Sequence, residues 1–525
     1  MTVDESDSTE TNSSQSDQLK VGPEATAGDS RARVAAKGFF WSGSSFAAQG
    51  IFQLVVVIVL ARRLTPSEFG IAQVTIVAIG IGRLFTGSVV GPAVVQRAEL
   101  EPRHIRTAVS MSVGFGLATS VALFVVAGPV AALFNDDRLI DMIRIVQFSF
   151  VIQALAVVPE ALLQRELRFK TIAQAEVISF ALGYAGVGVA LGLANAGVWA
   201  LVGAQLGQVL VHTVLLLISR PTLRPSYNHQ AARDIISFGG GFTLGRIFNY
   251  AALQGDNIVV GSMLSSAALG VYGRAYQLLA TPAMLMGQVI DRVLFPMLAS
   301  IQDKKDLLRL QYWRAVSLVA LVMLPLSSLV LVLAPEIVRV ILGPDWEAVV
   351  TPLRILAVSL VARTSYKVSD CLSKAVGLVY RRAARQATYA TLVVGGAAIG
   401  QTWGIAGVSI GVAFAVVANF GLMADLSLRA LEMSWREFAT AHLRGTVIAL
   451  IVLPLSLGVA EALRGAGAGA FVVVMVVVAL NLAVIGVVSY LRPIMVFGPA
   501  ISVLWNSVQK GNRPALQKSQ CEAAT

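Results

Sequence analysis

Long apolar stretches alternate with short polar segments along almost the whole chain of 525 residues. A helix needs roughly 20 mostly apolar residues to cross a bilayer, and fourteen stretches meet that need. We therefore predict an all-α polytopic membrane protein with about 14 transmembrane helices. The predicted spans are 38–61, 69–95, 106–133, 140–162, 171–193, 197–219, 234–261, 268–298, 313–341, 350–375, 384–402, 405–427, 441–462 and 468–490.

Basic residues collect in every second loop between these spans. Cytoplasmic loops of membrane proteins carry an excess of Lys and Arg, which predicts that both termini are cytoplasmic. The loops near 195, 266 and 402, which then lie outside, are poor in basic residues, and Arg62 and Arg63 are the main exception. The predicted inner loops carry Arg97, Arg103, Arg106, Arg165, Arg168, Lys170, Arg220, Arg224, Arg233, Lys304, Lys305, Arg309, Arg381, Arg382, Arg385, Arg429, Arg436 and Arg444.

The chain also contains an internal repeat. "RRLTPSEFGIAQ" (62–73) aligns with "SMLSSAALGVYGRA" (262–275), with Leu64 on Leu264 and Gly70 on Gly270, and "GVWALVGA" (197–204) aligns with "GIAGVSIG" (404–411). Six spans per repeat is an even number, so the two halves would share one orientation in the membrane. The predicted organisation is a disordered cytoplasmic tail (1–34), a six-helix lobe (35–219), a cytoplasmic linker (220–233), a second six-helix lobe (234–427), two additional spans (428–490) and a cytoplasmic tail (491–525).

Polar residues form stripes along several of these apolar spans. In 234–261, Arg246, Asn249, Asp256 and Asn257 fall on one side of a helix, while Ile247, Phe248 and Ile258 fall on the other. Because a charge at mid-bilayer costs about 2.5–3.5 kcal/mol, such a stripe should face the bundle interior or a water-filled cavity. The same pattern occurs in two later spans. In 268–298 it consists of Arg274, Gln277, Thr281, Gln288 and Arg292, and in 350–375 it consists of Ser359, Arg363, Lys367, Asp370 and Lys374.

Cations outnumber anions among the charges inside the spans. The charges are Arg83, Arg246, Arg274, Arg292, Arg363, Lys367 and Lys374 against Glu176, Asp256, Asp291 and Asp370. The polar groups could pair with one another and join helices, and Arg292 and Lys374 could extend to the cytoplasmic surface. The remaining cations favour a positively charged cavity for an anion, because the planar guanidinium matches phosphate oxygens. We predict substrate contacts from Arg83, Arg246, Asn249, Arg274, Gln277, Arg363 and Lys367, and charge pairing or ion coupling by Asp256, Glu176, Asp370 and Asp291.

Composition and motifs argue against other classes of function. Only 14% of residues are charged, against about 25% in soluble domains. The net charge of +11 need not indicate nucleic-acid binding, because excess Lys and Arg in a membrane protein usually collect in cytoplasmic loops. Cys371 and Cys521 lack neighbours at metal-ligand spacing. No phosphate-binding loop, Ser/His/Asp or metal signature occurs, so we expect neither an enzyme nor a bound cofactor or metal.

Several stretches resemble the polysaccharide transporter branch of the multidrug/oligosaccharidyl-lipid/polysaccharide (MOP) superfamily, the Wzx-type flippases. They are "KGFFWSGSSFAAQG", "LARRLTPSEFGIAQV", "LQRELRFKTIAQAEV", "GDNIVVGSMLSSAALGVYGRAYQL", "RVLFPMLASIQ" and "GIAGVSIGVAFA". The resemblance implies a transporter in the bacterial cytoplasmic membrane that moves an undecaprenyl-diphosphate-linked oligosaccharide to the periplasmic leaflet for exopolysaccharide, capsule or O-antigen synthesis. It also implies a polysaccharide polymerase and co-polymerase as partners. Asp256 in "GDNIVVG" matches a motif position of the family, and we expect it to hold Arg246 or Arg274.

Two other functions stay open at this point. A cation-coupled multidrug exporter of the same superfamily would need an acidic cavity for its usually cationic substrates, against which the excess of cations argues. The second alternative is a non-transport role, as a polysaccharide ligase or polymerase or as a membrane scaffold. Such an enzyme would be expected to have a large external loop, whereas every predicted external loop is short. Transport would proceed by alternating access between the two lobes, driven by an ion gradient, with H⁺ carried on Glu176 or Asp256, or by consumption of the product.

Overall fold

The computed structural model describes residues 44–491 except 46–47, 87–89, 98 and 223–224. The side chains of 83–86, 96, 236–249, 379, 488–489 and 491 also lie outside the description. The predicted tails, 1–34 and all but the first residue of 491–525, fall outside it as well. Every regular element in the described part of the chain is helical, as the sequence predicts.

The first half of the chain begins with the helix Ala48–Ala61 and continues to the end of α9. Several spans are interrupted: η1 is a π-helical segment between α7 and α8, and α5 and α6 are joined at Gln147. The elements are α2 (Pro66–Thr86), α3 (Val90–Gln96), α4 (Pro102–Phe134), α5 (Arg138–Val146), α6 (Phe148–Arg165), α7 (Phe169–Ile178), η1 (Ser179–Gly186), α8 (Val187–Leu193) and α9 (Trp199–Ser219).

The second half begins with the 35-residue helix α10. Its elements are α10 (His229–Met263), α11 (Ser266–Val289), η2 (Ile290–Leu294), α12 (Phe295–Ser300), α13 (Lys305–Ile341), η3 (Pro344–Val349), α14 (Val350–Val358), α15 (Leu360–Ala375), α16 (Val379–Gly400), η4 (Gln401–Trp403), α17 (Gly404–Leu431), α18 (Trp435–Gly465) and α19 (Ala470–Leu491).

Short polar side chains fix where several of these helices begin. Asn228 accepts a hydrogen bond from the backbone N–H of Ala231 at the start of α10, and Ser265 accepts one from Ala268 at the start of α11, both 3.0 Å long. Ser434 does the same for α18. These caps satisfy backbone donors that a helix leaves unpaired in its first turn, so the loops can be short.

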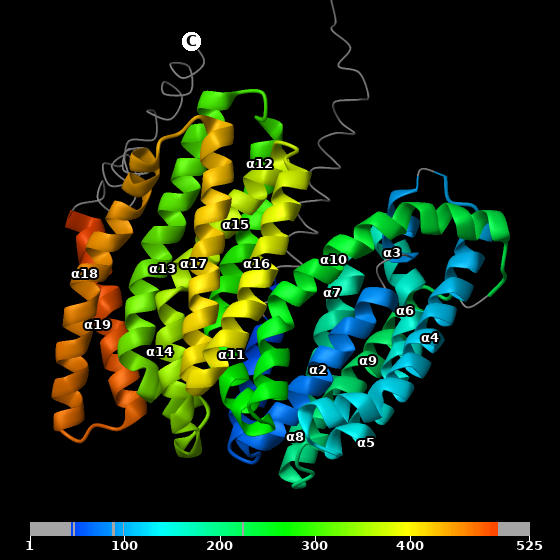
Figure 1. Ribbon diagram of the computed structural model, residues 1–525, viewed down its shortest axis with the longest axis horizontal. Coiled ribbons are helices and arrows are strands. Elements are labelled where there is room, and N and C mark those ends of the chain that lie inside the picture. The colour runs from blue at the N-terminus through cyan, green and yellow to red at the C-terminus, as the bar shows by residue number, and fades with distance from the viewer. Residues whose placement is uncertain (1–43, 46–47, 87–89, 98, 223–224, 492–525) are drawn as a thin grey trace, which may run out of the picture.

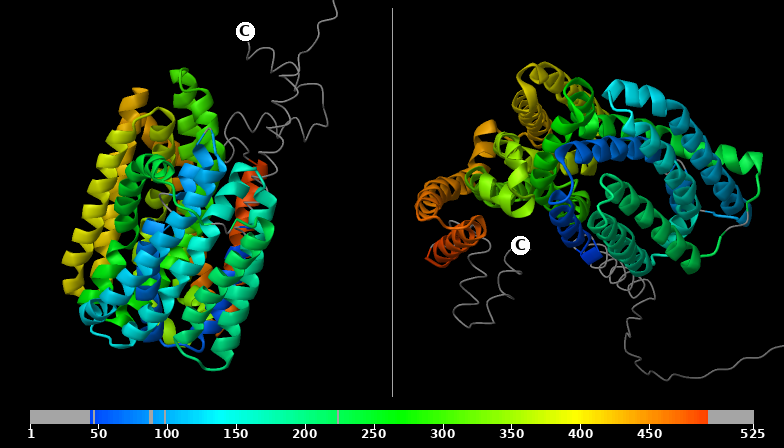
Figure 2. Two further views of the ribbon diagram at one scale, coloured as in Figure 1. Left: turned by 90° about the vertical axis from the view of Figure 1, so that its right-hand side faces the viewer. Right: turned by 90° about the horizontal axis from the view of Figure 1, so that it is seen from below.

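The helices stand side by side in two groups, with α10 running obliquely between them (Figure 1). Helices α2 to α9 form one group, and α11 to α17 form the other, with α18 and α19 packed on the outer side of α13 (Figures 1 and 2). We call the end that holds residues 220–228 the linker end. We call the opposite end, where α2 and α11 begin, the crossing end.

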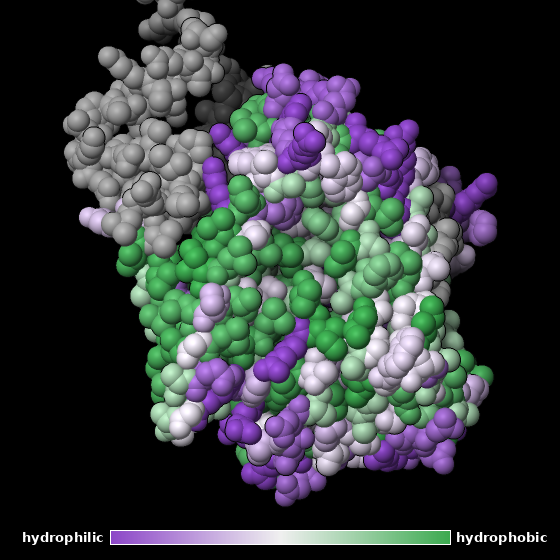
Figure 3. Space-filling view, turned by 60° about the vertical axis from the view of Figure 1, so that its left-hand side comes forward, coloured by the Kyte–Doolittle hydropathy of each residue, from purple (hydrophilic) through white to green (hydrophobic). Residues whose placement is uncertain are grey.

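The surface fits a membrane environment. Apolar side chains form a broad band between two polar ends in Figure 3, and residues such as Leu450 and Phe471 are more than half exposed. Among the described residues, nine helices are long and apolar enough to cross a membrane, or up to ten if the bent pair Pro344–Val358 and Leu360–Ala375 is one span. The chain is therefore a multi-pass membrane protein.

The predicted number of about 14 spans stays a prediction. The continuous stretch Tyr380–Leu431 is counted once, although α16 and α17 both lie within it. Ala48–Ala61 and Pro66–Gly82 are apolar but shorter than a full span in the described residues. The side chains in the middle of α10 lie outside the description. These three circumstances account for most of the difference between the 14 predicted spans and the nine or ten helices that meet the length and composition criteria among the described residues.

At the crossing end, α2 and α11 approach so closely that their backbones touch. A Cβ atom at Gly70 would lie 1.7 Å from the carbonyl oxygen of Ser266, and one at Gly270 would lie 1.8 Å from the carbonyl oxygen of Pro66. Only glycine leaves room for this approach. The contact is reciprocal, and it joins the two glycines that the internal repeat places in register.

Candidate functional site: a basic cavity beside α11

A cavity of about 470 Å³ lies between the helix Ala48–Ala61, η1 and α11. Its polar side chains are Gln49, Gln53, Arg274, Gln277 and Thr281, and the rest of its lining is mostly apolar. The apolar part consists of Ile51, Leu54, Val57, Phe180, Leu278, Met284, Leu285 and Leu342. Because Ile51 and Met284 are also more than half exposed on the outer surface, the apolar side of the cavity continues onto the lipid-facing surface.

Arg274 is the charged residue on this wall, and it is only 7% exposed. Its guanidinium carbon lies 4.6 Å from the centre of the Phe69 ring. No carboxylate among the described side chains lies within 4.0 Å of it, and its Nε has no hydrogen-bond partner there. A buried cation without an anion is costly, so this arrangement favours an anion supplied by a ligand.

Arg363 and Lys367 lie on α15 within a cluster of tyrosines. Arg363 donates from Nη1 to the hydroxyl of Tyr276 over 2.7 Å, and its guanidinium carbon lies 4.5 Å from the centre of that ring. Lys367 Nζ lies 5.3 Å from the ring centre of Tyr366. The Nε and Nη2 atoms of Arg363 are enclosed without a partner in the described residues, which costs about 1–3 kcal/mol for each unsatisfied donor.

Asp256 is buried on α10. It accepts hydrogen bonds from the hydroxyl of Tyr272 over 2.6 Å and from the backbone N–H of Asn257 over 2.9 Å. Among the described side chains it forms no ion pair with Arg274, and the side chain of Arg246, the other partner that we expected, lies outside the description. Tyr272 in turn lies 6.1 Å from Tyr276, measured between ring centres. Asp256 thus belongs to the tyrosine cluster that holds Arg363.

Glu176 lies on α7 beside the cavity. It accepts a hydrogen bond from Ser45 over 2.8 Å and another from Gln49 over 3.4 Å, and Gln49 is itself part of the cavity lining. The carboxylate therefore faces hydroxyl and amide donors rather than a cation in these contacts. Glu176 thus lies next to the cavity lining, and its predicted role in charge pairing or ion coupling stays a prediction.

Asp370 and Asp291 lie away from the cavity, where α15 approaches the linker end. Lys374 Nζ lies 2.8 Å from Asp370 and 3.3 Å from Asp291, and Arg382 donates to Asp370. These acids are thus fully engaged by nearby cations. The structure brings together Arg274 and Gln277, and separately Arg363 and Lys367, but it places this acidic pair in a network of its own.

Arg83, Arg246 and Asn249 were also predicted as substrate contacts. All three sit in helices, the first in α2 and the other two in α10, but their side chains lie outside the described residues. Their predicted roles therefore stay predictions.

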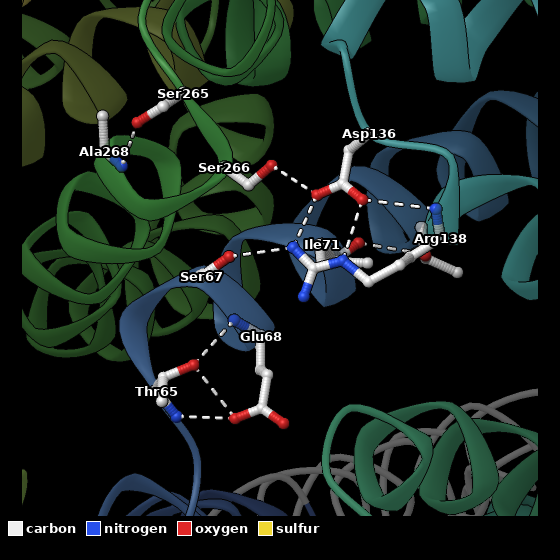
Figure 4. Close-up of polar contacts among 10 residues, drawn as sticks. Thr65, Ser67, Glu68, Ile71, Asp136, Arg138, Ser265, Ser266 and Ala268 are labelled. Carbon is white, nitrogen blue, oxygen red and sulfur yellow. Dashed lines mark hydrogen bonds and ion pairs between the residues drawn. The ribbon is translucent and has the colours of Figure 1, made fainter.

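The crossing end is closed by a polar cluster that the sequence reasoning did not identify. Arg138 donates to both carboxylate oxygens of Asp136, over 2.9 and 2.8 Å, and to the hydroxyl of Ser67 over 3.1 Å (Figure 4). Ser266, from the other half of the chain, donates to Asp136 over 3.1 Å. The hydrogen bond from Arg138 holds the pKa of the Asp136 carboxyl below its ordinary value of 3.8.

A second set of contacts joins the halves at the same end. Trp346 donates from Nε1 to the carbonyl oxygen of Ala61 over 2.8 Å, and Arg62 donates to the carbonyl of Val340 over 3.3 Å. The Phe69 ring meets Trp346 edge to face, with ring centres 5.1 Å apart. The crossing end is therefore held together by backbone contact, hydrogen bonds and aromatic packing.

Sequence reasoning also missed the aromatic residues that hold the arginines. The polar stripes in the sequence point to neither Phe69 nor Tyr276. One signal was present: Tyr272 and Tyr276 are four residues apart and so lie on one face of α11. The partner of each ring lies in another helix, however, and no local spacing could supply that pairing.

Comparison with known proteins places the chain in a family. The family model described as "Polysaccharide biosynthesis protein" matches residues 59–351, which is more than half of the chain. The chain belongs to this family.

Relatives in the polysaccharide biosynthesis family come from several bacteria. The lipopolysaccharide biosynthesis protein WzxC of Escherichia coli is 25% identical over 307 residues, which is 58% of this chain and 62% of WzxC. The teichuronic acid biosynthesis protein TuaB of Bacillus subtilis is 24% identical over 61% of this chain and 67% of its own length. The succinoglycan biosynthesis transport protein ExoT of Rhizobium meliloti is 24% identical over 62% and 66%. The match to WzxC thus covers less than two thirds of that relative.

Solved structures show that this family member has the fold of MOP superfamily transporters. The lipid II flippase MurJ in an inward closed conformation aligns with a TM-score of 0.67, 11% identity, and coverage of 85% of this chain and 98% of MurJ. An inward-facing multidrug resistance transporter of the MATE family aligns with a TM-score of 0.60, 16% identity, and coverage of 73% and 94%. The chain thus shares its fold with these two transporters.

Proposed function

We propose that this protein flips a polyprenyl-diphosphate-linked oligosaccharide from the cytoplasmic to the periplasmic leaflet of the bacterial cytoplasmic membrane. The observation that carries the proposal is the cavity beside α11, where Arg274 has no carboxylate partner in the described structure and an apolar wall continues onto the lipid-facing surface. A lipid-linked saccharide has the matching chemistry: an anionic diphosphate, an isoprenoid chain and sugars rich in hydroxyls.

Each part of that substrate has a suitable surface. Guanidinium groups bind phosphate oxygens through charge-assisted hydrogen bonds, and Arg274 is the cation on the cavity wall. Gln49, Gln53, Gln277 and Thr281 offer amides and hydroxyls for sugars. Ile51 and Met284 border the bilayer, so the isoprenoid chain could stay in lipid while the headgroup crosses.

The relatives support the same class of substrate. The printed names of the matched proteins refer to lipopolysaccharide, teichuronic acid and succinoglycan biosynthesis, and a further relative, from Shigella flexneri, is named a putative O-antigen transporter. These polymers differ in their sugars. We therefore propose that the basic cavity recognises the diphosphate that lipid-linked precursors would share, and not a particular sugar.

The alternative is a cation-coupled multidrug exporter, which the fold alone would allow because MATE transporters share it. Cationic drugs need an acidic cavity. Glu176 is hydrogen-bonded to a residue of the cavity lining, but the charged side chain on the lining itself is Arg274. The charge balance therefore favours an anionic substrate.

The proposed cycle is alternating access, with the crossing end facing the periplasm and the linker end facing the cytoplasm. The basic loops predicted to be cytoplasmic cluster at the linker end. The contacts of Ser266 with Asp136 and of Trp346 with Ala61 close the opposite side in this conformation. Release to the periplasm would require these contacts to separate.

The test is to locate the lipid-linked repeat unit in a deletion strain. Spheroplasts are treated with a membrane-impermeant glycosidase, and the lipids are then extracted. We expect intact repeat unit to accumulate on the protected cytoplasmic leaflet while polymer disappears, and the wild-type gene to restore both. Repeat unit that is cleaved normally in the deletion strain would refute the flippase function, and drug sensitivity would then be the next measurement.

A further inference from the structure

The two arginines best placed to bind an anion are held by aromatic rings instead of by acids. Arg274 lies over Phe69, at 4.6 Å from its centre, and Arg363 lies over Tyr276, at 4.5 Å. Neither has a carboxylate within 4.0 Å among the described side chains. The two arginines come from α11 and α15, and their rings come from α2 and α11, so the arrangement occurs twice in unrelated local sequence.

The choice of partner determines which hydrogen-bond donors stay available. A carboxylate binds in the plane of the guanidinium and uses its N–H groups. A ring face attracts the cation electrostatically from above or below and uses none of them. In Arg274 the Nε donor is enclosed and unpartnered, and in Arg363 both Nε and Nη2 are.

The geometry of Arg363 is the more specific of the two. The Tyr276 hydroxyl accepts a hydrogen bond from Nη1 over 2.7 Å, which fixes the rotation of the guanidinium within its own plane. The opposite edge, Nε with Nη2, is enclosed and has no hydrogen-bond partner in the described residues. This edge presents two parallel N–H donors, the arrangement that binds two oxygens of one phosphate.

We propose that Phe69 and Tyr276 are positioning residues, which hold Arg274 and Arg363 by their ring faces so that the free guanidinium donors bind phosphate oxygens of the transported lipid. This inference rests on the proposed function, because the diphosphate headgroup supplies those oxygens. It adds that the tyrosine hydroxyl orients Arg363, with Tyr272 and Asp256 behind it in the same cluster.

The test measures lipid binding to the purified full-length protein in detergent. The probe is geranylgeranyl diphosphate, and geranylgeraniol, which has the same chain without charge, is the reference. Tyr276→Phe keeps the ring and removes the hydroxyl. We expect it to weaken diphosphate binding about three- to tenfold, as expected for one charge-assisted hydrogen bond, and to leave geranylgeraniol binding unchanged.

Two further variants separate positioning from packing. In an Arg363→Gln background, Tyr276→Phe should have no further effect on diphosphate affinity, because its target is gone. Tyr312→Phe is the matched control: that hydroxyl is also hydrogen-bonded, to Ser369 over 2.8 Å, but in the described part of the chain no arginine lies over its ring. It should bind the diphosphate like wild type.

The outcomes distinguish this inference from the function on which it rests. If wild type prefers the diphosphate but Tyr276→Phe binds it equally well, or weakens both lipids alike, the positioning role is wrong and the flippase function stands. If Tyr276→Phe still weakens diphosphate binding in the Arg363→Gln background, the positioning role is also wrong, and the flippase function is unaffected. If wild type does not prefer the diphosphate over the alcohol, both the anion site and the proposed substrate are wrong.

Discussion

The two arginines that we propose bind an anion and the arginines at the linker end have partners of opposite kinds. Arg274 and Arg363 lie on aromatic rings, and each has buried donors without a hydrogen-bond partner in the described residues. At the linker end, Arg385 pairs with Asp425 at 2.9 Å and Arg309 pairs with Glu437. A carboxylate neutralises the positive charge of the arginine that it pairs with. An aromatic ring positions an arginine without neutralising it, so the positive charge can still attract an anionic ligand. The type of partner, rather than burial, therefore distinguishes the arginines that we propose bind the substrate from the arginines that pair with acids.

The largest effect should follow from removing the cavity charge. Arg274→Gln should reduce polymer export at least tenfold, because a desolvated phosphate would lose its main counter-charge. Arg274→Lys should keep part of the export. Arg429→Gln, at an exposed linker-end arginine paired with Asp425, is the control and should export normally. Polymer is quantified in cells with matched protein levels, and normal export by Arg274→Gln would contradict the assignment.

Giving Arg274 an acidic partner should make the cavity resemble the linker end. Gln277 is three residues further along α11 and also lines the cavity, so Gln277→Glu places a carboxylate within reach of the guanidinium. We expect export to fall by about threefold to tenfold, as the new acid competes with phosphate. Gln277→Asn controls for side-chain length. An unchanged rate for Gln277→Glu would mean that Arg274 does not meet an anion.

The converse change at the linker end should affect stability more than transport. Asp370→Asn leaves Lys374 and Arg382 without their shared acid. Because both cations are partly exposed, we expect a loss of only about 1–2 kcal/mol, seen as a lower melting temperature in detergent. Export at permissive temperature should stay within about twofold of wild type. A collapse of export in a folded variant would show that this network also serves transport.

The smallest effect concerns pH at the crossing end. Arg138 lowers the pKa of Asp136, so the ion pair contributes stability above the ordinary carboxyl pKa of 3.8 and loses it only as pH falls through the still lower folded value. Closure of this end should thus be constant between pH 5 and 8. Accessibility of a cysteine placed at Ser67 to a membrane-impermeant thiol reagent measures it, and Arg138→Gln should increase labelling at every pH. A pH-dependent rise in wild-type labelling within that range would contradict this account.

The sequence predicted the helical membrane fold and part of the site. Apolar stretch length identified the helices, because each side chain in a span faces either lipid or protein, and both environments favour apolar residues. Helical spacing also predicted that Arg274 and Gln277 would share a wall. The aromatic partners and the partner of Asp256 could not be predicted, since Phe69 with Arg274 and Tyr272 with Asp256 meet across different helices.

The reciprocal contact of Gly70 and Gly270 has a consequence for the history of the chain. If the two halves arose by duplication, the ancestral gene encoded one half and the working assembly was a pair of identical chains. Both glycines would then descend from one glycine position of the ancestral chain. In the pair of identical chains, that position would have contacted the same position of the other chain at the symmetry axis. Any mutation there would have introduced a side chain on both sides of the crossing at once. After duplication each position could change separately, and both remain glycine because either Cβ alone would strike the opposite backbone.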